Sequence, residues 1–172
     1  MAYGQDITEE KDNFLPFTVF KSEGDSLSIA SLVNKAYLFT TSDIHSEKAN
    51  ASNAYWVRAD LATFLPLIES DSLWYMQTGS FYNITCYFQG ENSIESKAFR
   101  PLNTKKKYFY YSTKDGIYFG AKNLIQGRYL FLKIRFYSSN ENFNDLKLKL
   151  RTSAAKKIES NYYRWEDVVE AS

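Results

Sequence analysis

The chain has 172 residues and a formal net charge of +1, with 44% hydrophobic and 24% charged residues. This length fits one domain with a single core, and the composition excludes an intrinsically disordered chain. The near-zero net charge also provides no global attraction to nucleic acid or to an acidic membrane. Aromatic residues are enriched at 17%, and they favour strands as well as surfaces that contact proteins or sugars.

The first thirteen residues are polar and acidic and have no hydrophobic period, which predicts an N-terminal arm over 1–13. This segment lacks the basic stretch and apolar core of a secretory signal, so we expect synthesis in the cytoplasm without export by that route. No apolar run approaches the length of a membrane span, and we therefore predict no membrane partner.

The next forty residues predict mainly extended segments. Phe14–Phe20 is apolar and contains Pro16, which favours an edge strand. Leu27 and Ile29 alternate with polar residues, and Ala36–Thr40 indicates a second strand.

The segment from Tyr55 onward mixes two periods. Tyr55–Arg58 is predicted to be extended, whereas a short helix is predicted to start at Asp60 and to be disrupted by Pro66. A further strand is predicted over Ser72–Gln77.

The second half contains three strands with clear alternation. One face of each is apolar and is expected to face the core. These inward residues are Tyr82, Ile84, Cys86 and Phe88; Leu130, Leu132, Ile134 and Phe136; and Leu146, Leu148 and Leu150. The opposite face of the second strand, which carries Phe131, Lys133 and Arg135, is predicted to point away from that core.

About eight to ten short strands with turns between them predict an all-β antiparallel sandwich over 14–152. The stretches "GSFYNITCYFQG", "GRYLFLKIRFYSS" and "NDLKLKLRT" resemble jelly-roll domains of the carbohydrate-binding-module kind, which also occur in bacteriophage virion proteins. This resemblance implies a jelly-roll-like β-sandwich.

Residues 153–172 predict a short C-terminal amphipathic helix. Ile158, Tyr162, Trp165 and Val169 follow one another at spacings of four, three and four residues and form one apolar stripe. A helix this short needs a surface to bury its stripe, either the sheet of its own domain or another protein. We take these four residues as the candidate protein contact.

The side chains that usually carry catalysis are scarce. The single histidine, His45, falls in a polar loop, and Cys86 falls on an apolar strand face, where a buried role is expected. We therefore predict no catalytic residues, no metal site and no cofactor. A pair of turn carboxylates among Asp60, Glu69, Asp71 and Asp115 leaves a glycan-cleaving site open.

Aromatic side chains suggest an alternative function in sugar binding, through a stacking platform. The candidates are Trp56, Trp74, Tyr75, Tyr129 and Tyr137. Basic residues interleaved with aromatics, such as Lys133 and Arg135, give a second alternative, a β-domain that binds single-stranded nucleic acid, although the balanced net charge disfavours it.

Together these features predict a non-catalytic structural or attachment component of a large assembly. A bacteriophage virion is the setting implied by the resemblance, as a capsid decoration, head fibre or tail-associated protein. The expected partners are other subunits of that assembly, in a homo- or hetero-oligomer.

Overall fold

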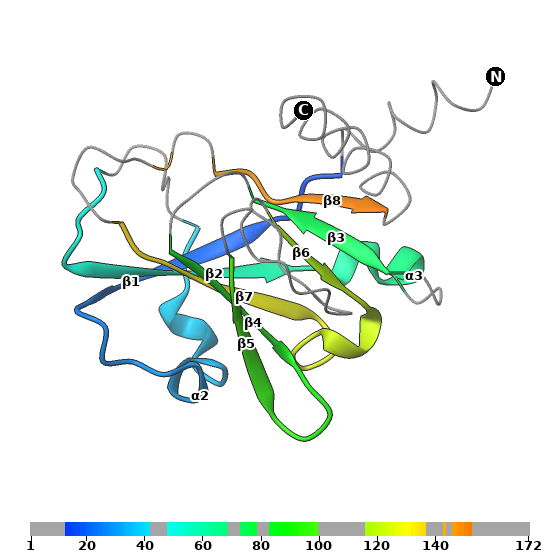
Figure 1. The fold of residues 1–172 in the computed structure, drawn as a ribbon, viewed down its shortest axis with the longest axis horizontal. Coiled ribbons are helices and arrows are strands. Elements are labelled where there is room, and N and C mark those ends of the chain that lie inside the picture. Colours follow the sequence, from blue (N-terminus) through cyan, green and yellow to red (C-terminus); the bar gives the residue numbers. More distant parts are fainter. Residues whose placement is uncertain are drawn as a thin grey trace, which may run out of the picture.

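The computed structural model describes residues 13–41, 48–68, 73–78, 83–99, 116–136, 143 and 146–152, and these form a mostly β structure (Figure 1). A five-stranded antiparallel sheet has the order β1-β2-β7-β4-β5, and a three-stranded antiparallel sheet has the order β6-β3-β8. The strands are β1 (Phe17–Glu23), β2 (Asn53–Asp60), β3 (Trp74–Gln77), β4 (Ile84–Gln89), β5 (Ile94–Ala98), β6 (Gly116–Phe119), β7 (Tyr129–Ile134) and β8 (Lys149–Thr152).

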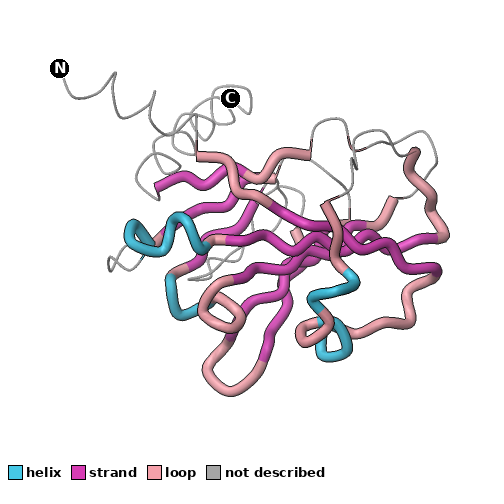
Figure 2. Tube along the Cα trace, turned by 180° about the vertical axis from the view of Figure 1, so that it is seen from behind, coloured by secondary structure: helices cyan, strands magenta, loops and turns pink. Residues whose placement is uncertain are grey.

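The two sheets share one hydrophobic core. Figure 2 shows the strands of the sheets from behind. Side chains of β7 and β4 meet those of β3, β6 and β8 in this core, and the predicted alternation is confirmed for the residues described. Those that are buried as expected are Ile84, Cys86, Phe88, Leu130, Leu132, Ile134, Phe136, Leu146, Leu148 and Leu150. We call the side of the five-stranded sheet that faces this core its inner face.

The opposite, outer face of the five-stranded sheet is buried by residues 27–39. These residues form α2 (Ile29–Leu32) and the 3-10 helix η1 (Ala36–Leu38), so the two strands predicted here are wrong. Extended pairing is limited to a bridge between Thr40 and Val19. Short helices prevail because they place Leu32 and Phe39 in an apolar cluster with Phe131.

A short helix does follow Asp60, as predicted, but Pro66 does not disrupt it. The 3-10 helix η3 (Ala62–Phe64) continues into α3 (Leu65–Ile68). The N–H of Ala62, which has no acceptor within the helix, donates to Asp60 Oδ1 at 3.0 Å. Pro66 lies in the first turn of α3, where a backbone N–H has no helical acceptor to lose.

The predicted terminal segments lie outside the described residues, except for Asn13. Its carbonyl accepts a hydrogen bond of 2.8 Å from the N–H of Leu150, beside the bridge between Phe14 and Lys149. The predicted edge position of the first strand is confirmed, since β1 ends the five-stranded sheet.

Candidate functional site

An ion cluster on the outer face joins the turn after β1 to the end of β7, the central strand of the five-stranded sheet. Gly24, with a φ of 70°, turns the chain after β1 and is followed by Asp25. Lys133 Nζ donates to Asp25 Oδ1 at 2.9 Å, and Arg135 Nη1 donates to Asp25 Oδ2 at 2.7 Å. We call these three residues the Asp25 cluster.

The Asp25 cluster contains one anion and two cations. The pKa of Asp25 lies below its ordinary value, chiefly because Lys133 donates a hydrogen bond to the carboxylate, with further contributions from Arg135; burial opposes this shift. Arg135 also donates through Nη2 to the carbonyl of Ala51 at 3.3 Å, and Lys133 Nζ lies 5.6 Å from the centre of the Trp56 ring. The cluster therefore holds one positive charge in excess in a fixed position.

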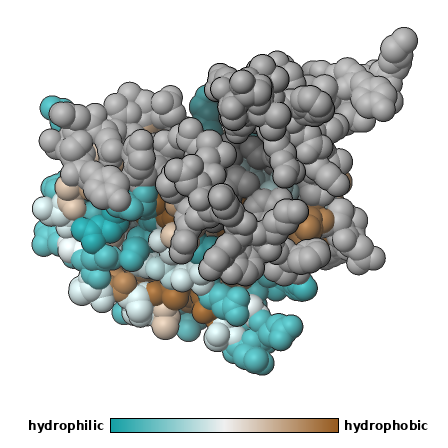
Figure 3. All heavy atoms as spheres, in the orientation of Figure 1, coloured by the Kyte–Doolittle hydropathy of each residue, from teal (hydrophilic) through white to brown (hydrophobic). Residues whose placement is uncertain are grey.

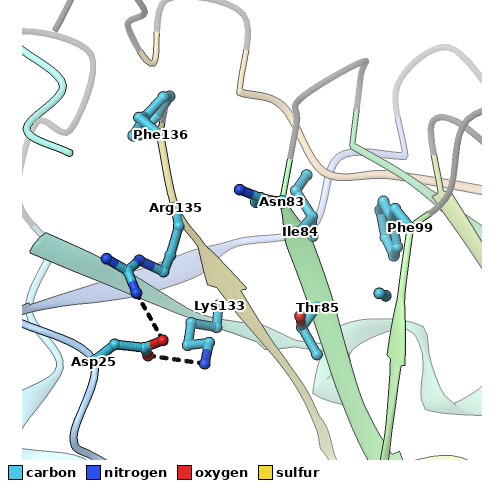
Figure 4. Close-up of a pocket in the computed structure, with 9 residues that line it drawn as sticks. Asp25, Asn83, Ile84, Thr85, Phe99, Lys133, Arg135 and Phe136 are labelled. Atoms are coloured by element: carbon cyan, nitrogen blue, oxygen red, sulfur yellow. Dashed lines mark hydrogen bonds and ion pairs between the residues drawn. The ribbon is translucent and has the colours of Figure 1, made fainter. Parts of the chain in front are cut away.

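A cavity of about 450 Å³ lies beside this cluster (Figure 4). Its polar lining comes from the Asp25 cluster together with Asn83 and Thr85, and its apolar lining comes from Ile84, Ala98, Phe99 and Phe136. Asn83 adopts a φ of 57°, and its carbonyl accepts the Arg135 N–H at 3.1 Å, which joins the start of β4 to the end of β7.

A second ion pair on the five-stranded sheet has balanced charge. Arg128 Nε and Nη2 donate to the two carboxylate oxygens of Asp60 at 2.8 and 2.6 Å. The pKa of Asp60 is lowered, first by this side-chain bond from Arg128, while burial opposes the shift. Neither residue lines the cavity of the Asp25 cluster.

Three of the aromatic residues predicted to form a sugar platform are interior residues. Trp56, Trp74 and Tyr75 are 0%, 7% and 0% exposed, so the expectation that they stand on the surface is wrong. Trp56 packs on the outer face in the apolar cluster that includes Phe39 and Phe131. Trp74 and Tyr75 belong to the three-stranded sheet. The strand pattern alone could not identify the second layer that covers Trp56.

Tyr129 is half-buried, and the Arg58 and Arg128 guanidinium groups lie 4.7 and 5.1 Å from its ring centre. The structure therefore does not bring the predicted aromatics into one exposed row. Tyr137 lies outside the described residues, as do the predicted protein-contact residues Ile158, Tyr162, Trp165 and Val169.

Cys86 is fully buried, as predicted, and burial raises the pKa of its thiol well above the ordinary value. Of the carboxylates considered for glycan cleavage, Asp60 is engaged by Arg128 and by the N–H of Ala62. Glu69, Asp71 and Asp115 fall outside the described residues, as does His45.

Within the part of the chain that the structure describes, no group of three or more His, Cys, Asp or Glu side chains could hold a metal ion. In the same residues, no helix has the length and apolar character needed to cross a membrane.

The sequence pattern identified Lys133 and Arg135 as basic residues on an outward strand face, but it did not single out Asp25. The contact spans 108 residues between Asp25 and Lys133, and no local pattern reports such a pairing. No known protein family and no curated protein matches the chain.

Proposed function

We propose that this protein is a non-catalytic structural or attachment subunit of a larger protein assembly and that it associates with a second copy of itself through β5. A bacteriophage virion is the setting implied by the resemblance to jelly-roll domains, and the finer jelly-roll topology belongs to the same proposal. The observation that carries the proposal is the self-complementary edge formed by β5.

Strand β5 is an edge of the five-stranded sheet. Among the described strands it pairs only with β4. The β4–β5 hairpin projects from the body in Figure 1, and the projecting end of the surface is hydrophilic in Figure 3. Glu95, Ser96 and Ala98 are exposed along this strand. An exposed edge presents backbone N–H and C=O groups to which another strand can add.

The hydrogen bonds of the hairpin show which backbone groups point outward. Phe99 donates to the carbonyl of Ile84, and Gly90 donates to the carbonyl of Ser93, both at 2.8 Å. Because hydrogen-bonded pairs alternate along an antiparallel ladder, Glu95 and Lys97 bond to β4. Ile94 and Ser96 therefore direct their backbone N–H and C=O groups away from β4.

A two-fold axis at Ser96 satisfies both the hydrogen bonding and the charges of this edge. Antiparallel pairing about that axis places Ser96, which has outward backbone groups, opposite its own copy. Glu95 then lies directly opposite Lys97 of the second copy, and opposite charges in such a cross-strand pair are favourable. The charges that would guard this edge against other strands thus favour a second copy.

The test is a charge swap measured by size-exclusion chromatography with light scattering across a concentration series. Wild type is expected to dimerise, whereas Glu95→Lys and Lys97→Glu each place like charges opposite one another and shift the protein to monomer. The double variant, Glu95→Lys with Lys97→Glu, restores the opposite charges and is expected to recover the dimer.

Ser96→Pro supplies a second test, because proline removes an outward N–H from the edge without removing a bond to β4. It is expected to yield a folded monomer, with an unchanged β-sheet circular-dichroism spectrum. A wild-type monomer at every concentration, or single swaps that dimerise as well as wild type, would contradict the β5 proposal.

A further inference from the structure

We infer that the cavity beside the Asp25 cluster binds the carboxylate group of an acidic sugar. The cavity shares Ala98 with β5, but all of its lining residues come from one chain, so ligand binding and association are measured separately. It also differs from the sugar platform predicted from the sequence, whose tryptophans are buried.

Charge selects a monoanion. Lys133 and Arg135 together carry two positive charges against the single negative charge of Asp25, so the cluster has a net charge of +1. A carboxylate would neutralise this excess, whereas a phosphate dianion would leave the site negative. Guanidinium and ammonium groups have more N–H donors than the three hydrogen bonds to Asp25 and Ala51 use, so donors remain for a ligand.

The remaining lining favours a sugar over an isolated acid. Asn83 and Thr85 contribute amide and hydroxyl groups that suit sugar hydroxyls, while Phe99 and Phe136, which are 8% and 4% exposed, add only small apolar areas to the lining. Figure 4 shows these residues around the same space, with Asp25, Lys133 and Arg135 on one side. A cavity of about 450 Å³ has room for one monosaccharide and falls within the usual range for small-ligand sites.

Asp25 gives the inference a sharp test, because its carboxylate competes with the ligand for the same two cations. Asp25→Asn keeps the shape of the side chain and an oxygen acceptor for Lys133 or Arg135, but it removes the competing charge. Binding of a carboxylate should therefore become tighter, by about 3-fold or more. If the Asp25 cluster only tethers the turn after β1, neither wild type nor Asp25→Asn should bind a carboxylate.

The experiment is an NMR titration of the full ¹⁵N-labelled chain with D-glucuronate, and with D-glucose as the neutral match. Saturable shifts are expected for glucuronate at the backbone amides of Asn83, Thr85, Lys133 and Arg135. Arg135→Gln removes a charge-assisted donor and should weaken binding by about 10-fold or more. Arg128→Gln, which alters the balanced pair with Asp60, is the matched control and should leave the affinity unchanged.

Acetate, inorganic phosphate and an acidic peptide complete the titration. Each is expected to bind more weakly than glucuronate, and an equal or tighter affinity for any of them would overturn the assignment to an acidic sugar. Equal shifts with glucose, no saturable shift, or an Arg135→Gln variant that binds as well as wild type would overturn it too. Should Arg135→Gln not fold, Lys133→Gln replaces it. Lys133→Gln also removes a cation and should weaken glucuronate binding, whereas Asp25→Asn should tighten it.

Discussion

The inner face and part of the outer face of the five-stranded sheet are buried, but by different kinds of contact. On the inner face, Leu130, Leu132 and Ile134 pack against the apolar side chains of a second sheet. On the outer face, Phe131 and Trp56 are covered by the short helices of residues 27–39. The charged side chains of Arg58 and Lys133 lie against aromatic rings of this apolar cluster. Burial on the outer face therefore depends on a segment that adds few backbone hydrogen bonds to the sheet.

This comparison shows why the outer face combines stability with binding. Cations there lie against aromatic rings, for example Arg58 at 5.4 Å from the centre of Phe39 and 4.7 Å from that of Tyr129. Such contacts keep a charge near the surface while its aliphatic stem covers apolar area. The described core residues of the inner face are almost entirely apolar, whereas the outer face has the charged side chains of the Asp25 cluster.

The largest expected effect comes from Phe131, whose ring is 1% exposed and packs edge-on against Phe39 with 5.7 Å between ring centres. Phe131→Ala should lower the free energy of unfolding by about 3–5 kcal/mol, as is typical of a buried phenylalanine. Urea denaturation measures this loss. Leu132→Ala, which probes the inner face one residue later, should cost about 2–5 kcal/mol.

The matched control for Phe131 is Phe14, which is 47% exposed. Phe14→Ala should change the free energy of unfolding by no more than about 0.5 kcal/mol, as surface changes usually do. A loss at Phe131 as small as that at Phe14 would mean that residues 27–39 do not exclude water from the outer face.

Cys86 tests the inner face by a smaller change. Cys86→Ser places a hydroxyl among Ile84, Leu132 and other apolar neighbours. The thiol donates to the carbonyl of Tyr87 at 3.9 Å, which is too long for a hydroxyl, so burial of the hydroxyl should cost about 1–3 kcal/mol. In the native wild type, the raised thiol pKa and full burial should prevent reaction with a thiol reagent until urea unfolds the chain. Rapid modification in the absence of urea would show that the inner face opens.

The sequence predicted the inner face well because alternation is a local property. The spacing of Leu130, Leu132 and Ile134 determines which side chains point together, and the apolar side must be buried. The helix after Asp60 was also predictable, since a carboxylate precedes helix-forming residues. The error at Pro66 arose because proline is harmful inside a helix but harmless in its first turn.

The outer face could not be predicted in the same way. Phe131 alternates with the inner residues and was expected to point away from the core, which it does; the second layer that covers it comes from a segment about a hundred residues earlier. Short helices such as α2 lack the length that gives a periodic signal. The Asp25 cluster likewise depends on contacts between residues that are distant in the sequence.

The smallest expected effect is on acid stability, and it separates the two faces once more. Because the folded-state pKa of Asp25 is lowered, its carboxylate contributes stability that is fully present above its ordinary pKa of 3.8 and is lost as the pH falls through the lower folded value. Asp25 is partly exposed, so the contribution should remain under about 1 kcal/mol. The free energies of unfolding of wild type and Asp25→Asn, measured by urea denaturation, should differ at neutral pH and converge below pH ~3.

Leu132→Ala is the control. Its loss of unfolding free energy should be independent of pH over this range, because the substitution removes only apolar contact. A difference between wild type and Asp25→Asn that grows in acid would reverse the sign expected for Asp25 and refute its role as an ionised partner of Lys133 and Arg135.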